Sequence, residues 1–287
     1  MNFARVIKAE VNWDTNRRSP DFDGLRSSPS NGGDSRLQIV GLLQIQQKTS
    51  ALYTTAKSTG LEINTSKTKS LRINTQNNSD ITLDNQSIED VNQFTYLGSI
   101  VSKNGGADSD IKSRLGKARH ACVTLRPLWK NKNIRQKTKL RIFETNVKSV
   151  LLYGSETWKQ TKKNEHDLQV FINKCLRQIL QIRWPNKISN SDLWNRTGQS
   201  SISSTIKKRK WHWIGHILRR PQHNITRQAL DWNPQGKRRK GRPTTTWRRT
   251  VEAELKSCNI TWAEAKRAAM NRPRWRAVVD ALCPTRG

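Results

Sequence analysis

Positive charge is concentrated in one part of this chain. Residues 101–287 hold 42 Lys and Arg against 12 Asp and Glu, whereas residues 1–100 hold 11 against 10. Any fold of the later segment has to keep these side chains at its surface, where like charges repel each other unless solvent or a polyanion screens them. The charge distribution therefore favours a polyanionic partner, and the obvious polyanion is nucleic acid.

The composition predicts packed structure rather than a disordered polycation. Hydrophobic residues make up 33% of the chain, which includes 11 Trp, and this content is enough to build a core. Linker histones and basic ribosomal proteins are instead rich in Lys and Ala and poor in Trp. We expect the tryptophans to lie in packed helices.

Cysteine spacing and hydropathy indicate the cellular setting. The four cysteines are Cys122, Cys175, Cys258 and Cys283. They form no close pair that could begin a zinc site and lack the density of a disulfide scaffold, so we expect reduced, buried thiols. No apolar run reaches the length of a membrane span, and the N-terminus lacks the core of a signal peptide. We expect an intracellular, soluble protein without a membrane partner, and a nuclear location stays open.

The pattern of apolar residues and turn formers predicts an α+β fold. Residues 1–35 carry turn formers without periodicity and are expected to form a disordered extension. Residues 37–59 have helical periodicity, and Gly60 is placed to end that helix in a left-handed cap. The strands expected next are residues 61–64, 71–73, a hairpin over 81–88 with Asp84 and Asn85 at its tip, and 94–101.

Helices are expected from there to the C-terminus. Asp108 can cap the first of them, and Thr261 with Glu264 makes a capping box for a later one. Pro273 is placed to begin the last helix, which carries Trp275. The apolar spacing places the first helix and four more over residues 111–129, 140–151, 168–182, 202–220 and 244–256.

Several motifs in order give a resemblance to a known family. GLEINTSKTK at residues 60–69 and FTYLGS at residues 94–99 resemble the later palm of reverse transcriptases from non-long-terminal-repeat (LINE- or RTE-like) retrotransposons. The motifs similar to the thumb and C-terminal region of the same elements are KLRIF at 139–143, LLYGSETW at 151–158, WIGH at 213–216, GRP at 241–243 and TWRR at 246–249. The resemblance covers about residues 40–287, and the order of the motifs makes it specific.

The resemblance implies a C-terminal fragment of an RNA-directed DNA polymerase, without the fingers and most of the palm. It implies palm-motif roles for Asn64, Lys67 and Lys69 and a primer-grip-like turn at Tyr96, Leu97 and Gly98. An incomplete palm would leave a strand edge and an apolar face uncovered, so we expect the palm region to be poorly soluble alone. The implied regions are a partial palm over residues 36–104, a helical thumb-like region over 105–185 and a basic helical region over 186–287.

The metal-binding aspartates of such a polymerase are missing. Nucleotide transfer depends on two metal ions held by clustered aspartates. In this family a paired Asp precedes the helix that leads to the Gly-Leu-x-Ile-Asn strand, whereas residues 34–41 read DSRLQIVG here. Asp21 and Asp23 lie further upstream and are interpreted as loop acids. We therefore expect no catalytic residue, metal, cofactor or polymerase activity in this chain alone; an active polymerase would need aspartates from another chain.

A zinc site has weak support. His212 and His216 have the spacing of two zinc ligands on a helix, but Trp213 replaces the Glu that a zinc protease needs. A structural zinc that adds Cys258 or His223 stays open. The favoured interpretation is that these histidines face a phosphate backbone or pack beside tryptophans, without a metal.

An endonuclease is a further alternative. Asp231 with Glu254 and Lys256 could be fitted to the pattern of metal-dependent nucleases, in which the Glu and Lys lie on a strand. The apolar spacing of Trp247 and Val251 instead predicts an amphipathic helix, with Glu254 on its solvated side. The pattern therefore argues against a nuclease.

Basic clusters are the strongest functional signal. KKRK at residues 207–210 and KRRKGRP at 237–243 could neutralise phosphates, and the second resembles the centre of a minor-groove hook that reads A·T tracts. The alternatives are a solvated loop or a nuclear import signal. The predicted nucleic-acid-binding residues are Lys207, Lys208, Arg209, Lys210, Arg219, Arg220, Lys237, Arg238, Arg239, Lys240, Arg242, Arg248 and Arg249.

The resemblance implies RNA or an RNA/DNA hybrid rather than duplex DNA as the partner. A minor-groove or scaffold protein derived from the element is the alternative, and the oligomeric state stays open. Trp211, Trp213, Trp232 and Trp247 lie among the basic residues. They could stack on unpaired bases, but burial between amphipathic helices is the favoured interpretation.

Overall fold

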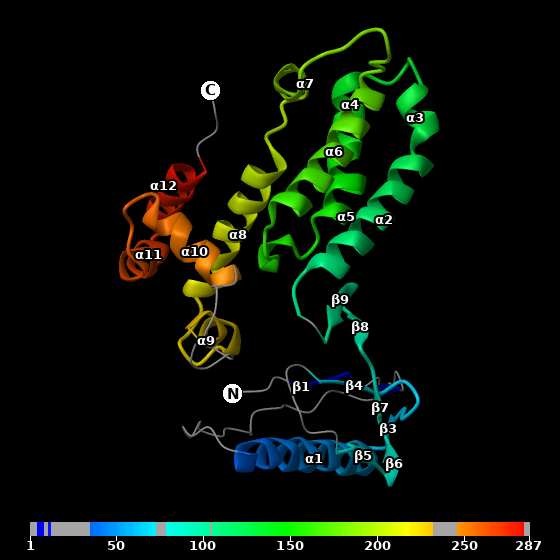
Figure 1. The fold of residues 1–287 in the computed structure, drawn as a ribbon, viewed down its shortest axis with the longest axis vertical. Helices are drawn as coiled ribbons and strands as arrows, with labels where there is room; N and C mark the ends of the chain where they lie inside the picture. Colours follow the sequence, from blue (N-terminus) through cyan, green and yellow to red (C-terminus); the bar gives the residue numbers. More distant parts are fainter. Residues whose placement is uncertain are drawn as a thin grey trace. The chain divides into compact units, whose positions relative to one another are not determined.

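The computed structural model describes residues 5–8, 11–12, 35–72, 79–103, 105–231 and 246–283, with side chains from Ile45 onward. These residues form two compact units, an N-terminal unit that ends at Gly105 and a helical unit that begins at Gly106 (Figure 1). Small sheets in the first unit and helices in the second confirm the predicted α+β class. In the described part of the chain, no helix combines the length and the apolar character that a membrane-spanning segment needs.

The N-terminal unit contains one long helix, α1 (Ser35–Ser58), and short strands. Ala56 on α1 packs with Ile63, Ile81 and Leu83 in a small core. The strands are β1 (Arg5–Lys8), β2 (Val11–Asn12), β3 (Glu62–Ile63), β4 (Lys69–Arg72), β5 (Thr82–Leu83), β6 (Gln86–Ser87), β7 (Glu89–Asp90), β8 (Gln93–Tyr96) and β9 (Ser99–Ser102). In the largest sheet β1 is antiparallel and β7 parallel to β4, while β2–β3, β5–β6 and β8–β9 form antiparallel pairs.

Two expectations for the N-terminal unit are wrong. Strands β1 and β2 lie within residues 1–35, where we expected no packed element, and β1 pairs with β4 from Arg5 opposite Arg72 onward. The edge of β4 presents N–H and C=O groups that a short extended segment can satisfy without any local sequence signal. Residues 94–101 form the hairpin β8–β9 rather than one strand, because Leu97 and Gly98 have φ of +48° and +79° and turn the chain back.

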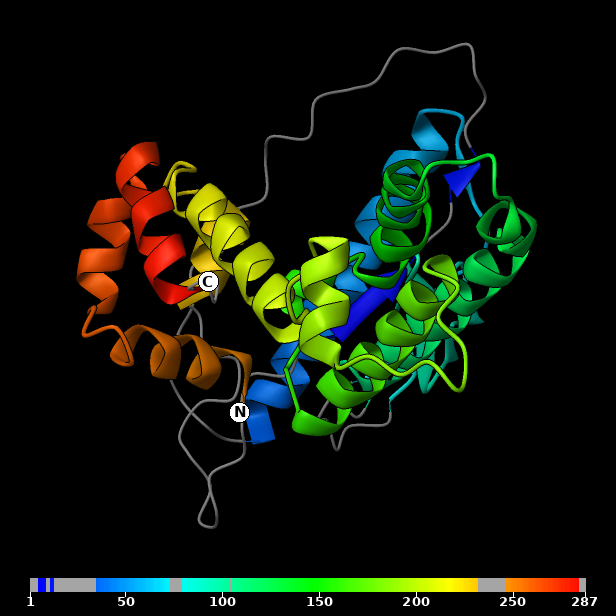
Figure 2. The same cartoon turned by 90° about the horizontal axis from the view of Figure 1, so that it is seen from above.

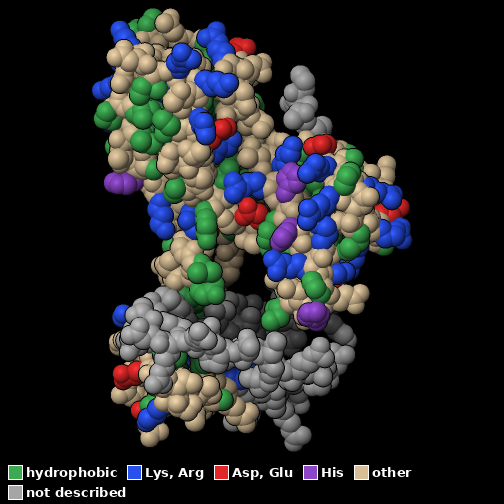
Figure 3. Space-filling view, turned by 180° about the vertical axis from the view of Figure 1, so that it is seen from behind, with side chains coloured by type: hydrophobic (Ala, Val, Ile, Leu, Met, Phe, Trp, Pro, Cys, Tyr) green, Lys and Arg blue, Asp and Glu red, His purple; other side chains and the backbone are tan. Residues whose placement is uncertain are grey.

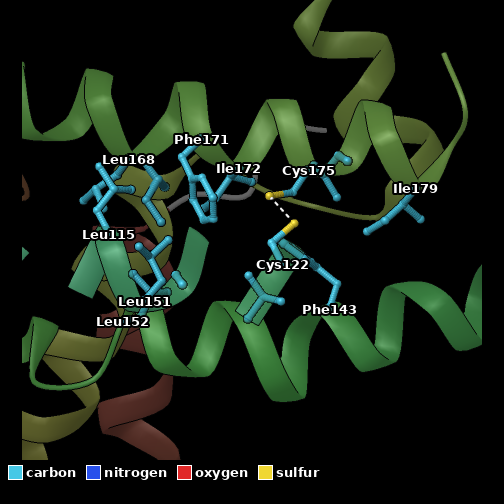
Figure 4. Packing of buried hydrophobic residues seen from close by; sticks show 14 of the residues in the cluster. Leu115, Cys122, Phe143, Leu151, Leu152, Leu168, Phe171, Ile172, Cys175 and Ile179 are labelled. Atoms are coloured by element: carbon cyan, nitrogen blue, oxygen red, sulfur yellow. Dashed lines mark hydrogen bonds between the residues drawn. The ribbon is translucent and has the colours of Figure 1, made fainter. Parts of the chain in front are cut away.

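The first core of the helical unit lies among α2 to α7 and the start of α8. Its buried side chains include Leu115, Phe143, Leu168 and Phe171, which point toward one another between helices (Figure 4). A π-helical segment, η1, interrupts the helix predicted over 140–151. The elements are α2 (Asp108–Thr124), α3 (Arg126–Lys130), α4 (Gln136–Ile142), η1 (Phe143–Lys148), α5 (Ser149–Leu151), η2 (Ser155–Thr157), α6 (Lys162–Ile179) and α7 (Asn190–Thr197).

The helix predicted over residues 111–129 is two helices, α2 and α3. Pro127 has no N–H to donate to the carbonyl four residues earlier, so one continuous helix cannot pass this point. Asp108 is the first residue of α2 rather than its cap. Its carboxylate accepts a hydrogen bond from Asn164 Nδ2 at 2.7 Å, which joins α2 to α6.

Two cysteines meet in the first core. Cys122 on α2 and Cys175 on α6 are buried, and their Sγ atoms lie 3.1 Å apart (Figure 4). The hydrogen bond between them lowers the pKa of Cys122 to about 7 and raises the pKa of Cys175. Cys283 is also buried whereas Cys258 is half-buried, so the prediction of buried thiols is confirmed for three of the four cysteines.

The second core of the helical unit lies among α8 to α12, and α8 lies between the two groups of helices (Figure 2). Gly215 on α8 faces Trp275 on α12, where a Cβ on Gly215 would lie 1.9 Å from Trp275 Nε1. That nitrogen donates to the carbonyl of Trp211 at 3.1 Å. Only glycine permits this close crossing. The helices are α8 (Ile202–Leu218), α9 (Ile225–Asp231), α10 (Trp247–Lys256), α11 (Trp262–Ala269) and α12 (Arg272–Leu282).

Several local signals act as the sequence predicted. Gly60 has a φ of +76° just after α1, and Asp84 and Asn85 have φ of +49° and +59° at the tip of the β5–β6 hairpin. The Thr261 hydroxyl accepts from the Glu264 N–H while the Glu264 carboxylate accepts from the Thr261 N–H, which completes the capping box of α11. Helix α12 carries the predicted proline in its first turn.

Candidate nucleic-acid interface

The LLYGSETW motif joins helices of the helical unit. Trp158 Nε1 donates to the buried carboxylate of Asp110 on α2 at 3.0 Å. The Glu156 carboxylate accepts from Arg209 Nε on α8 at 3.0 Å. The Glu156 carbonyl accepts from Trp247 Nε1 on α10 at 2.9 Å. The motif therefore fixes the positions of α8 and α10. The orientation of α8 in turn determines which of its basic side chains are exposed to solvent.

The tryptophans of the WIGH and TWRR motifs belong to the core. Trp213 and Trp247 pack edge to face, with ring centroids 6.2 Å apart and an interplanar angle of 86°. Trp211 is fully buried against Trp275, with ring centroids 6.1 Å apart. This confirms the favoured interpretation for Trp211, and the half-buried Trp213 and Trp247 pack against the same core. Trp232 lies outside the described residues.

Lys210 is not a surface cation. Its side chain is 2% exposed, and its Nζ lies 2.6 Å from Glu254 Oε1 on α10. The other oxygen of Glu254 accepts from Trp211 Nε1 at 2.6 Å. The expectation that Lys210 contacts phosphate is therefore corrected, because its charge is already neutralised inside the protein. Glu254, only 13% exposed, does not lie on a solvated side of its helix either, although the helix itself forms as predicted.

The other residues of the KKRK cluster point in different directions. Successive residues of an α-helix are about 100° apart around the axis, so four consecutive cations cannot line one surface. Lys207 is half-buried, and Arg209 is engaged by Glu156. Lys208 is exposed and lies 3.4 Å from Asp280 on α12. Of the four predicted residues, Lys208 presents the most accessible charge.

A basic face forms instead across α8 and α12, and we call it the α8–α12 face. On α8 the exposed residues follow a spacing of four, as expected for one side of a helix. Figure 3 shows Lys and Arg side chains, with His among them, gathered over this part of the helical unit. The α8–α12 face consists of Lys208, His212, His216, Arg219, Arg220, Arg272 and Arg276. Arg272 and Arg276 were not among the predicted residues, although the alternating arginines around Trp275 were a usable signal.

Electrostatic effects within the α8–α12 face show that it is positive. Burial, followed by the nearby charges of Lys208 and Arg276, lowers the pKa of His212, while Asp280 acts in the opposite direction. The imidazole of His216 is 3.2 Å from the guanidinium of Arg220 and accepts its hydrogen bond when neutral. A bound anion would relieve the repulsion among these groups.

Some of the remaining predicted cations of the helical unit form hydrogen bonds within the protein. Arg219 is half-buried and donates to the carbonyl of Ala269 at 3.1 Å. Arg248 donates to the carbonyl of Leu230, whereas Arg249 is exposed at the start of α10. Lys237, Arg238, Arg239, Lys240 and Arg242 lie outside the described residues.

The palm-like motifs lie in the N-terminal unit. Asn64 Oδ1 accepts from the Lys67 N–H at 3.0 Å, so Asn64 closes a turn after β3 and Lys67 is exposed on it. Lys69 forms an ion pair with Glu89 across β4 and β7. The primer-grip-like residues are the tip of the β8–β9 hairpin, where Tyr96 is 50% and Leu97 is 74% exposed and Gly98 supplies positive φ.

The alternative metal sites that fall within the described residues are not assembled. Among residues with described placement, no group of three His, Cys, Asp or Glu side chains could hold a metal ion. Cys258 Sγ contacts the carbonyl of Ala281 at 3.8 Å. Asp231 binds Lys266 and Trp262 rather than Glu254. Asp21, Asp23 and the DSRLQIVG aspartate lie outside the described side chains.

The fold and its candidate interface thus define an α+β chain with a cationic helical unit. A family model described as Domain of unknown function (DUF6451) matches residues 121–153. The chain is 26% identical over 203 residues to an uncharacterized transposon-derived protein, F52C9.6, of Caenorhabditis elegans, covering 67% of this chain and 71% of that protein. No solved structure matches. The similarity indicates a link to transposon-derived proteins.

Proposed function

We propose that this chain is a nucleic-acid-binding fragment of a retrotransposon reverse transcriptase that lacks polymerase activity of its own. Its origin is supported by the ordered palm and thumb motifs and by the similarity to a protein whose name describes it as transposon-derived. Nucleic-acid binding is supported above all by the α8–α12 face. In this proposal the fragment retains a template-holding surface, and RNA or an RNA/DNA hybrid is its preferred ligand.

The test is binding of the full chain to a structured RNA and to an A·T-rich DNA duplex across a salt series. Affinity should fall steeply from about 0.05 M to about 0.2 M salt, because phosphate contacts release counterions. RNA should bind more tightly. Tighter binding of the duplex would support the minor-groove alternative. Weak binding whose affinity does not change with salt concentration would refute the proposal. With a primed RNA, deoxynucleotides and Mg²⁺ or Mn²⁺, the same protein should not extend the primer.

Charge removal locates the interface. Lys208→Gln with Arg272→Gln and Arg276→Gln should weaken RNA binding roughly tenfold and reduce the salt slope by about two, because up to three phosphate contacts are lost. A control variant replaces Lys112, Lys163 and Lys174, which are also exposed on helices of the helical unit. It removes the same net charge away from the α8–α12 face. If both variants lose affinity equally, binding is spread over the whole cationic surface and the assignment to this face is wrong.

His212 should make binding depend on pH. Its pKa is lowered in the free protein, and a phosphate beside Lys208 and Arg276 would offset their charge and raise that pKa, so binding takes up a proton. Affinity should therefore rise about threefold between about pH 7.5 and about pH 5.5. His212→Asn should lose this dependence, whereas His223→Asn, at an exposed turn, should keep it. An unchanged pH profile in His212→Asn would exclude His212 as the linked group.

A further inference from the structure

Trp184, in the connection between α6 and α7, is an exposed tryptophan. Its relative exposure is 84%, whereas Trp129, Trp158, Trp211 and Trp275 are buried. The other tryptophans with described side chains, Trp194, Trp213, Trp247 and Trp262, are half-buried. Exposing the apolar surface of an indole to water is less favourable than burying it. Packing within this structure does not explain why Trp184 is exposed.

The connection that carries Trp184 is held at both ends. Before it, Gln181 Nε2 donates to the carbonyls of Trp129 and Lys130 at 3.3 and 3.4 Å. After it, Arg177 donates to Asn190 Oδ1 at 2.7 Å. The two isoleucines of the connection pack against the first core. The connection passes over the end of the helix group where α3 lies (Figure 1). Trp184 therefore sits on a segment whose position is fixed before any ligand arrives.

The segments that carry and hold Trp184 are rich in exposed cations and poor in acids. Arg183 and Lys187 are exposed on the same connection, and Lys130 and Lys132 are exposed at the end of α3 that Gln181 contacts. No Asp or Glu occurs in residues 111–143 or 168–191, which supply these elements. An exposed aromatic ring on a cationic segment matches a nucleobase and its phosphates better than an apolar protein surface.

We propose that Trp184 is a stacking platform for an unpaired base of single-stranded nucleic acid, with Arg183 and Lys187 binding phosphates of the same strand. The inference rests on the proposed nucleic-acid binding and adds a second contact region within the helical unit. Stacking needs an open base face, which a continuous duplex does not offer, so Trp184 should select unpaired segments. The α8–α12 face, which holds charge but no exposed tryptophan, would bind paired and unpaired strands alike.

The experiment compares two labelled probes, a twelve-nucleotide oligouridine and a blunt RNA duplex, with the full chain at low salt. Trp184→Ala should weaken oligouridine binding about tenfold and change duplex binding less than twofold. Trp184→Phe keeps an aromatic face and should stay within about threefold of the wild type. The control is Ile225→Ala, which removes an equally exposed apolar side chain (82%) and should change neither affinity. Circular dichroism melts confirm that each variant is folded.

The outcomes separate the two claims. If the wild type binds both probes and Trp184→Ala binds oligouridine equally well, the stacking proposal is wrong while nucleic-acid binding stands. Equal losses for oligouridine and duplex would also overturn it, because a duplex offers an open base face only at its ends. If the wild type binds neither probe, both proposals fail. Loss confined to oligouridine and recovered by Trp184→Phe supports the platform.

Discussion

Replacement of Gly215 by alanine should destabilise the helical unit by about 3 kcal/mol or more. The added Cβ would lie 1.9 Å from Trp275 Nε1 and 2.5 Å from two other ring atoms. The ring cannot move aside easily, since it is 2% exposed and hydrogen-bonded to the carbonyl of Trp211. Relief would require α8 and α12 to separate, which would expose apolar surface from both helices. Urea unfolding followed by circular dichroism measures the loss.

Gly116 provides the matched control for this substitution. It lies on α2, is exposed, and a Cβ there would meet nothing within 4 Å. Gly116→Ala should therefore stabilise the protein by about 0.5 to 1 kcal/mol, because alanine has the higher helix propensity. Similar unfolding midpoints for the two alanine variants would contradict the close packing of α8 on α12. The Gly215 variant should also lose RNA affinity, since α12 carries two arginines of the α8–α12 face.

Glu254→Gln is expected to have the second large effect, a loss of about 3 kcal/mol in the free energy of unfolding. The substitution keeps the shape of the side chain but leaves Lys210, at 2% exposure, without its counter-charge. The glutamine amide can accept from either Lys210 Nζ or Trp211 Nε1 but presents a donor to the other. Burial already lowers the pKa of Lys210, and Glu254 is the main group that opposes this shift. Chemical denaturation at constant pH gives the comparison.

Two further variants separate the buried ion pair from surface charge effects. Asp280→Asn breaks the pair with Lys208, whose members are 67% and 46% exposed, and should cost at most about 0.5 kcal/mol. Lys210→Met combined with Glu254→Gln should recover much of the lost stability, because methionine occupies a similar volume without leaving a buried unpaired charge. A Glu254→Gln variant no less stable than Asp280→Asn would show that Lys210 and Glu254 are not buried together.

Elements with local causes could be predicted from the sequence. Gly60, the Asp84 and Asn85 turn, and the Thr261 and Glu264 box each act through a few neighbouring residues, so their effect does not depend on the rest of the chain. Apolar spacing likewise predicted the helices, since burial of one side is a property of the segment. The strand β1 was missed because a partner distant in sequence, the edge of β4, decided its formation. The turn at Leu97 and Gly98 and the helix break at Pro127 had local causes that the prediction overlooked.

In the candidate interface, too, some features follow from the sequence and others from the tertiary structure. The sequence by itself determined that the C-terminal part of the chain is cationic and helical, because charge and periodicity are properties of composition and order. Tertiary structure alone decided which cations face solvent. Lys210 is neutralised because α10 brings Glu254 to it, while Arg272 and Arg276 join the α8–α12 face because α12 crosses α8 closely at Gly215. Accessibility depends on which helices pack together, and that depends on contacts between residues far apart in the chain.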